Sequence, residues 1–160
     1  MSECPIAPGE TKTYVFKCTQ FGTSWYHSHW SAQYGEGVVG TIIINGPATA
    51  NYDVDLGVLP LTDWYYRPLF ELNEQAQHST TGPPAANNLL VNGTHINANG
   101  GGSYAKINVT KGKKYRIRII NTSVDQVFHV SMVSCINWMP VVVMKLTTCQ
   151  GRTPLHRNHV

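Results

Sequence analysis

The sequence predicts an all-β fold built as a sandwich of short antiparallel strands. Several segments alternate apolar and polar side chains with the period of two that is typical of half-buried strands. Turn signals rich in glycine, proline and asparagine separate these segments. The composition agrees with a globular chain the length of one ordinary domain, because 42% of the 160 residues are hydrophobic and only 13% are charged.

Two strands are predicted in the first fifty residues. Tyr14, Phe16 and Cys18 alternate with residues of the opposite face, which indicates a half-buried strand. A second apolar run within residues 38–44 stops at Asn45-Gly46-Pro47 and predicts a buried strand followed by a turn. We expect a domain edge just after this turn.

The next forty residues contain a connector, a helix and a loop. Residues 48–60 are expected to connect two domains and to become a strand where apolar residues alternate from Val54 to Val58. Pro68 to His78 carries apolar residues at helical spacing, which predicts one short helix. Ser79 to Asn88 is rich in Thr, Gly, Pro and Asn and is predicted to be a loop.

The strongest hairpin signal lies between residues 105 and 119. Residues 105–109 alternate in period two, Lys111-Gly112-Lys113 supplies a turn, and residues 115–119 alternate again. This pattern predicts a β-hairpin whose basic outer face is solvated and is not a binding patch.

His27-Ser28-His29 points most directly to chemistry. In a strand, residues two positions apart share a face and lie roughly 6.6 Å apart, which suits two neighbouring metal ions better than one. Neutral imidazole binds copper, zinc, iron or nickel, so the pair alone does not choose a metal. Seven histidines in this chain would give about 0.3 such pairs by chance, so the bare motif is a weak signal.

Aromatic residues surround this pair along the sequence. Trp25, Tyr26 and Trp30 are candidates for side chains that exclude water and position the rings, with ordinary packed core residues as the alternative. The glycines at positions 35, 37 and 40 allow close approach of the backbone.

Long stretches on both sides of the histidine pair resemble one known family. They are Glu3-Cys4-Pro5-Ile6, Gly22 to His29, Ser31 to Ile42, Ile44-Asn45-Gly46-Pro47, Thr62-Asp63-Trp64-Tyr65, Leu90-Val91-Asn92-Gly93-Thr94 and Arg116 to Ser123. They resemble the fungal laccases, which are blue multicopper oxidases, and the ascomycete branch most of all. The resemblance covers most of residues 3–133.

This resemblance implies a cupredoxin-like Greek-key β-sandwich, with the second half of one domain and the first half of the next. Residues 1–48 would form the C-terminal part of the first domain, residues 49–60 a connector, and residues 61–133 the N-terminal part of the second domain. Beyond Val133 the resemblance stops. We interpret residues 134–160 as an intron read through or a frame error in a partial gene, with a divergent natural tail as the alternative.

The resemblance also implies a copper site and a substrate residue. His27 and His29 are each expected to ligate one copper of a type 3 pair, within a three-copper cluster that reduces dioxygen to water. Asp125 falls where the family carries an acidic residue in the pocket for the reducing substrate, and a carboxylate there can accept a phenolic proton. The alternative for Asp125 is a loop aspartate that closes a turn with its own backbone. The other five histidines match no ligand position.

The implied activity is that of a partial laccase, which oxidises phenols and aromatic amines by one electron each. The His-x-His-Gly and His-Cys-His segments of the family, and with them the cysteine of the type 1 copper, do not occur in the 160 residues. We therefore expect these residues alone to be inactive without the remainder of the laccase chain. Two alternatives stay open: a non-catalytic copper-binding cupredoxin module, and a β-sandwich interaction domain without a metal.

The charge distribution excludes a nucleic-acid partner for the part that resembles the family. The net charge is +3, but residues 1–133 contain nine acidic and nine basic residues and so carry no net charge. Nucleic-acid binding requires a concentrated basic face. No apolar stretch approaches the ~18 residues that a membrane-spanning helix needs, so no membrane partner is expected.

The resemblance implies a secreted, extracellular parent. The first twenty residues lack a hydrophobic signal region, so its signal peptide would lie upstream of Met1. The sequons at Asn92, Asn108 and Asn121 are candidate glycosylation sites, with unmodified polar residues of turns and strands as the alternative. Four cysteines allow three disulfide pairings, among which the sequence does not choose. In the family a cysteine placed like Cys4 bridges to a distant domain.

Overall fold

Strands dominate the computed structural model, which describes residues 3–133 and 143–148. The described ranges contain one α-helix and one short 3-10 helix, so the all-β prediction is confirmed. In chain order the elements are β1 (Gly22–His27), η1 (Gln33–Glu36), β2 (Val39–Ile44), β3 (Val54–Trp64), α1 (Leu69–His78), β4 (Asn88–Val91), β5 (Tyr115–Asn121), β6 (Phe128–Val133) and β7 (Val143–Thr148).

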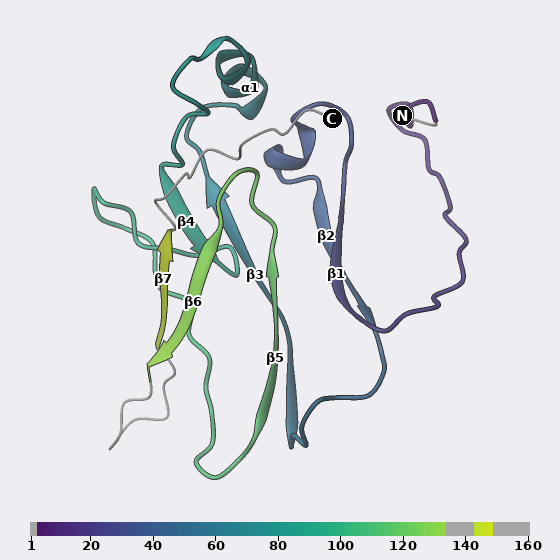
Figure 1. The fold of residues 1–160 in the computed structure, drawn as a ribbon, viewed down its shortest axis with the longest axis vertical. Helices are drawn as coiled ribbons and strands as arrows, with labels where there is room; N and C mark the ends of the chain where they lie inside the picture. Colours follow the sequence, from purple (N-terminus) through teal and green to yellow (C-terminus); the bar gives the residue numbers. More distant parts are fainter. Residues whose placement is uncertain (1–2, 134–142, 149–160) are drawn as a thin grey trace, which may run out of the picture.

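Three small sheets make up the described fold (Figure 1). β1 and β2 form an antiparallel hairpin with His27 opposite Val39, and this hairpin lies beside β5. β3 is the centre of a three-stranded sheet in the order β4-β3-β5, and β6 pairs with β7 in antiparallel fashion. α1 lies at one end of the central sheet, near the end of β1 that carries the histidines (Figure 1).

Three of the predicted elements are present. The apolar run before Asn45 is β2, the alternation that begins at Val54 is β3, and the helical spacing after Pro68 is α1. The predicted burial of β2 is wrong, because its residues are half-buried or exposed. β3 continues without a break past residue 60 to Trp64. The predicted loop separates α1 from β4.

The predicted hairpin between residues 105 and 119 is wrong. β5 pairs in parallel with β3, from Val54 opposite Tyr115 to Leu61 opposite Asn121. Residues 105–109 alternate between half-buried and exposed as their period predicts, yet they form no strand. Local alternation indicates which side chains are buried but carries no information on the partner strand, which here lies far away in the sequence.

The predicted solvated basic face is also wrong for β5. Arg118 is buried, whereas Ile119 is 44% exposed. The Arg118 guanidinium donates to Asp55 Oδ2 from Nε (3.2 Å) and Nη2 (2.9 Å), and to Thr23 Oγ1 from Nη1 (2.9 Å). These three bonds compensate the burial of the charge.

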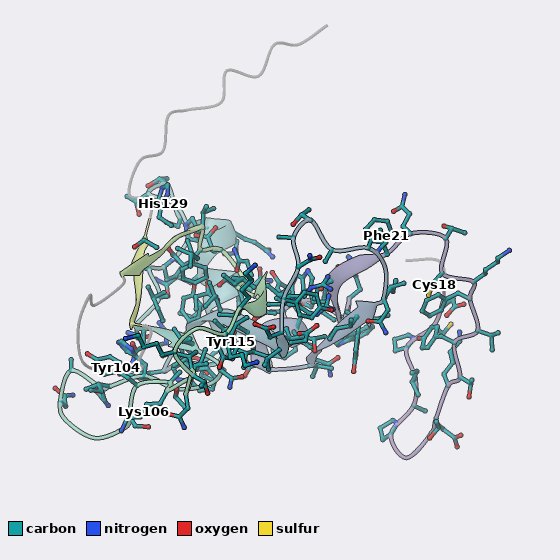
Figure 2. All side chains as sticks on the ribbon, turned by 90° about the horizontal axis from the view of Figure 1, so that it is seen from below. Cys18, Phe21, Tyr104, Lys106, Tyr115 and His129 are labelled. Atoms are coloured by element: carbon teal, nitrogen blue, oxygen red, sulfur yellow. The ribbon has the colours of Figure 1, made fainter. Side chains whose placement is uncertain are left out.

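The predicted strand at residues 13–18 does not form. All of these residues are exposed, and Val15 reaches 92% exposure. The segment runs alone, away from the sheets (Figure 1). In Figure 2, Cys18 accordingly lies apart from the main group of side chains, on the opposite side from Tyr104 and Lys106. A strand requires a neighbouring edge for its backbone hydrogen bonds, and no described strand lies beside this segment.

The last part of the chain is described only at β7. The interpretation of residues 134–160 as off-pattern therefore falls mostly on positions 134–142 and 149–160, which lie outside the described residues. Among the described residues, no helix is long and apolar enough to cross a membrane.

Candidate metal centre and substrate loop

His27 and His29 lie side by side at the end of β1. His27 is the last residue of the strand, and the N–H of Ser28 extends the pairing by donating to the Val38 carbonyl at 2.9 Å. The two imidazole rings are stacked, with centroids 5.5 Å apart and planes inclined by 29°. His27 is half-buried and His29 is exposed. The two rings therefore share one side of the chain, as strand spacing predicts.

A backbone hydrogen bond defines the proton position on His27. Its Nδ1 lies 2.9 Å from the Ser28 carbonyl oxygen. Because a carbonyl only accepts, we assign the proton to Nδ1, which leaves the Nε2 lone pair to bind a metal. A backbone carbonyl on the second ring nitrogen is the usual arrangement for a metal-binding histidine.

The turn after the histidines is tied to η1. The Ser28 hydroxyl donates to the Gln33 side-chain carbonyl and accepts the backbone N–H of Trp30 at 3.2 Å. Gly37 ends η1 with φ of 97°, a left-handed conformation that glycine adopts without strain. The chain can therefore reverse closely enough for Tyr34 of η1 to lie beside His27.

Of the three aromatic residues predicted around the pair, only Trp25 makes a ring contact with a histidine in the described part of the chain. Its ring stacks on His27 with centroids 4.3 Å apart. Tyr26 is 64% exposed and Trp30 is 50% exposed. Tyr26 lies over Gly40, where a Cβ would come within 2.3 Å of its ring.

Tyr34 is a neighbour of the pair that the sequence reasoning missed. From η1 its ring lies 5.2 Å from that of His27 and 6.3 Å from that of Trp25, centroid to centroid. Burial raises the pKa of Tyr34 first, and the charges of Asp63 and Asp125 raise it further. The only sequence signal was its place in the segment that follows the histidines.

Within the described residues, no group of three or more His, Cys, Asp or Glu side chains gathers closely enough to hold a metal ion. His27 and His29 are thus a pair of donors. His78 lies at the end of α1, and His95 makes an edge contact with Tyr104.

Asp125 lies on the loop between β5 and β6, and it is exposed. Its backbone N–H donates to Asp63 Oδ2 at 3.0 Å. Asp63 is only 3% exposed, and the hydroxyl of Tyr65 also donates to it, at 3.2 Å. Burial, followed by the nearby Asp63 charge, raises the pKa of Tyr65 well above its usual range. Sequence reasoning missed Asp63 as a residue that holds this loop.

A small core joins the histidine segment to the Asp125 loop. Ala32, Leu69 and Leu72 are buried together, and Tyr65 and Val124 pack against them. Gly35 approaches this core so closely that a Cβ would lie 1.9 Å from Leu69 Cδ1 and 2.8 Å from Val124 Cγ2. The Glu36 carboxylate accepts the backbone N–H of Leu69 at the start of α1. The pair and the loop are therefore held in one packed unit.

Two family models described as multicopper oxidase match the chain, one over residues 1–49 and the other over residues 55–134. The chain belongs to the multicopper oxidase family. Copper is therefore the metal that the family implies, and imidazole donors such as those of His27 and His29 fit it.

Named relatives of this multicopper oxidase include laccases. The chain is 60% identical to Laccase-3 of Botryotinia fuckeliana over 134 residues, which cover 82% of this chain and 30% of the relative. It is similar in structure to the laccase of Botrytis aclada, with a TM-score of 0.71, 46% identity, and coverage of 81% of this chain and 25% of that one.

It is also similar to Fet3p, which is described as a multicopper oxidase that functions in iron import. The TM-score is 0.61 and the identity 28%, with coverage of 91% of this chain and 28% of that one. The likeness to these structures confirms the cupredoxin-like all-β fold. The chain spans less than a third of the length of each of these relatives.

The sequons and cysteines of this multicopper oxidase lie at the surface where they are described. Asn92, in a turn with φ of 49°, and Asn108 are exposed. Asn121 is exposed but engaged, because its Nδ2 donates to the Gln126 carbonyl at 2.9 Å. Cys4 and Cys18 are exposed and unbridged, and the other two cysteines lie outside the described residues.

Proposed function

We propose that this chain is part of a laccase, which oxidises phenols and aromatic amines by one electron each and reduces dioxygen to water at a three-copper cluster. One observation carries the proposal: the rings of His27 and His29 are stacked with centroids 5.5 Å apart, and Nδ1 of His27 is hydrogen-bonded to the Ser28 carbonyl. The 60% identity with Laccase-3 of Botryotinia fuckeliana supports it.

His27 and His29 would each hold one copper ion of a type 3 pair. Copper, when bound, supplies the one-electron redox chemistry that dioxygen reduction requires. The chain's own residues orient the donors, because the Ser28 carbonyl selects the tautomer of His27 and Trp25 stacks on its ring. The Tyr34 ring, 5.2 Å from that of His27, would help to restrict the access of water.

Asp125 would bind the reducing substrate. A surface carboxylate can accept the hydrogen bond of a phenol and then its proton as the electron leaves. The exposure of Asp125 and the attachment of its backbone to Asp63 support this role.

The complete enzyme requires more than this chain, which covers less than a third of each relative. We place residues 1–48 in a first domain, residues 49–60 in a connector and residues 61–133 in a second domain. The type 1 ligands and the remaining histidines lie in the rest of a secreted laccase, glycosylated at one or more of Asn92, Asn108 and Asn121. These 160 residues alone have no oxidase activity.

The test compares His27→Ala and His29→Ala with His78→Ala in the complete oxidase that carries this segment. Removing either ligand should lower the copper content and reduce oxygen consumption with a phenol by at least about 100-fold. The control variant should keep both its copper content and its oxygen consumption, because His78 lies on α1 and not beside the pair. Copper content unchanged in the first two variants would remove the proposed site.

Two further outcomes separate the alternatives. Repeated oxygen-consuming turnover by the isolated 160 residues with copper and a phenol would contradict their inactivity. A complete protein that binds copper through His27 and His29, but oxidises neither phenols nor aromatic amines, would be a non-catalytic copper-binding module.

A further inference from the structure

Asp63 is a buried carboxylate without a cationic partner among the ion pairs of the described residues. It is 3% exposed, and those ion pairs involve other acidic residues. A buried charge of this kind is tolerated only when hydrogen bonds replace its hydration. The identity of its donors therefore indicates what Asp63 does.

Apart from the Tyr65 hydroxyl, its side-chain donors are three consecutive backbone amides of the loop that carries Asp125. Val124 N–H donates to Oδ1 at 2.9 Å, and Asp125 N–H (3.0 Å) and Gln126 N–H (3.3 Å) donate to Oδ2. Successive amides that converge on one anion form a nest. Here the anion is the carboxylate of Asp63, so the loop is hydrogen-bonded to a side chain of β3.

Further bonds hold the beginning of the loop against the same strand. Thr122 N–H donates to the Leu61 carbonyl at 2.8 Å, and the Ser123 hydroxyl accepts the N–H of Asp63 at 3.0 Å. The Asn121 side chain closes the loop by donating to the Gln126 carbonyl at 2.9 Å. The backbone at position 125 is thus fixed from both sides, while its side chain is exposed.

We infer that Asp63 is a positioning residue for the reducing substrate: it fixes the 122–126 loop so that the Asp125 carboxylate is presented at one place for a phenolic hydroxyl. The inference rests on the proposed role of Asp125. It assigns Asp63 no contact with the substrate and no redox role. Changing Asp63 should therefore affect only those electron donors that lose a proton when they are oxidised.

The test measures steady-state kinetics of the complete, copper-loaded oxidase with two electron donors. One is 2,6-dimethoxyphenol, which loses a proton, and the other is hexacyanoferrate(II), which does not. The variants are Asp125→Asn, Asp63→Asn and the double variant. Asp55→Asn is the control, because Asp55 lies on the same strand and also accepts a backbone N–H, but from Gly57 and not from the loop.

Asp63→Asn replaces one acceptor oxygen with a donor and should release at least one of the three amides. The KM for the phenol should rise about ten-fold, with the kinetics of hexacyanoferrate(II) unchanged. The double variant should be no worse than Asp125→Asn alone, because both changes remove one interaction. Asp55→Asn should leave the ratio of the two donors unchanged.

Equal losses with both donors, or additive effects in the double variant, would overturn the positioning role. If Asp125→Asn itself does not distinguish the donors, the substrate role of Asp125 fails and the inference falls with it. If Asp63→Asn does not fold, Asp63→Glu decides, because it keeps the charge and displaces the carboxylate. A phenol-selective rise in KM in that variant supports the inference, and its absence refutes it.

Discussion

His27 is constrained on three sides by its neighbours. Trp25 stacks on its ring, the Ser28 carbonyl accepts a hydrogen bond from its Nδ1–H, and the ring of Tyr34 lies 5.2 Å away. Each contact restricts the imidazole in the structure as it stands, so binding of the proposed copper would not need to order the ring. The protein therefore determines the direction of this donor.

Trp25 and Trp30 provide a matched pair of changes around this histidine. Trp25→Leu removes a stacked, half-buried ring, and in the complete oxidase we expect it to lower stability by roughly 2 kcal/mol and copper content measurably. Trp30→Leu should change neither, because Trp30 is half exposed. Copper analysis and urea unfolding would check both variants. Equal effects of the two changes would contradict the role of stacking.

Sequence reasoning identified some of these residues and missed others for a physical reason. Trp25 and His27 alternate along β1, and His29 follows two residues after the strand ends, so their shared side agrees with the period of two. Tyr34 reaches His27 only through the turn at η1, and Asp63 meets the 122–126 loop across sixty residues of sequence. Such contacts depend on tertiary structure, which local spacing does not encode.

η1 and α1 are two short helices that stabilise each other across the sequence. Each is too short to persist alone, so their stability comes from packing. Ala32, before η1, shares a core with Leu69 and Leu72 of α1, and the Glu36 carboxylate accepts the N–H of Leu69. The absence of a side chain at Gly35 permits this close packing.

Gly35→Ala should separate these helices. The new methyl group would overlap Leu69 Cδ1 and Val124 Cγ2, both of which belong to packed side chains. Overpacking of this kind costs about 1–3 kcal/mol. The double variant Gly35→Ala, Leu69→Ala removes the larger of the two overlaps, so the combined loss should be smaller than the sum of the two single losses. Strict additivity in thermal unfolding would rule out the proposed overlap.

Among the helices and strands too, features set by local sequence were predicted and features set by distant contacts were not. α1 and β2 arise from local patterns and were predicted from them. β5 was predicted as a strand but with the wrong partner and the wrong exposed face, because Arg118 finds Asp55 on β3. Residues 13–18 have the pattern of a strand without a described neighbour to pair with. The alternation of apolar and polar residues thus indicates which segments can form a strand. Partners that are distant in the sequence determine whether the strand forms and which strand it pairs with.

Arg118 links the sheets of the whole molecule. It donates to Thr23 on β1 and to Asp55 on β3. Thr23 lies four residues before His27 and therefore on the same face of the strand. The hairpin that bears the histidines is thereby attached to the central sheet. Because this attachment contains an ion pair, it should respond to pH.

Asp55→Asn tests that response in the complete oxidase. The Gly57 N–H, followed by the Arg118 guanidinium, lowers the pKa of Asp55. A carboxyl whose pKa is lower in the folded state stabilises the fold above its unfolded pKa of about 3.9 and loses this effect as the pH falls through the folded value. Asp55→Asn should therefore lower the urea unfolding midpoint near neutral pH, and the difference from wild type should shrink below about pH 4. Glu74→Gln removes the same charge from an exposed residue on α1 and should show no such trend. A difference that grows as the pH falls would contradict the linkage and the stabilising role of the Arg118–Asp55 pair.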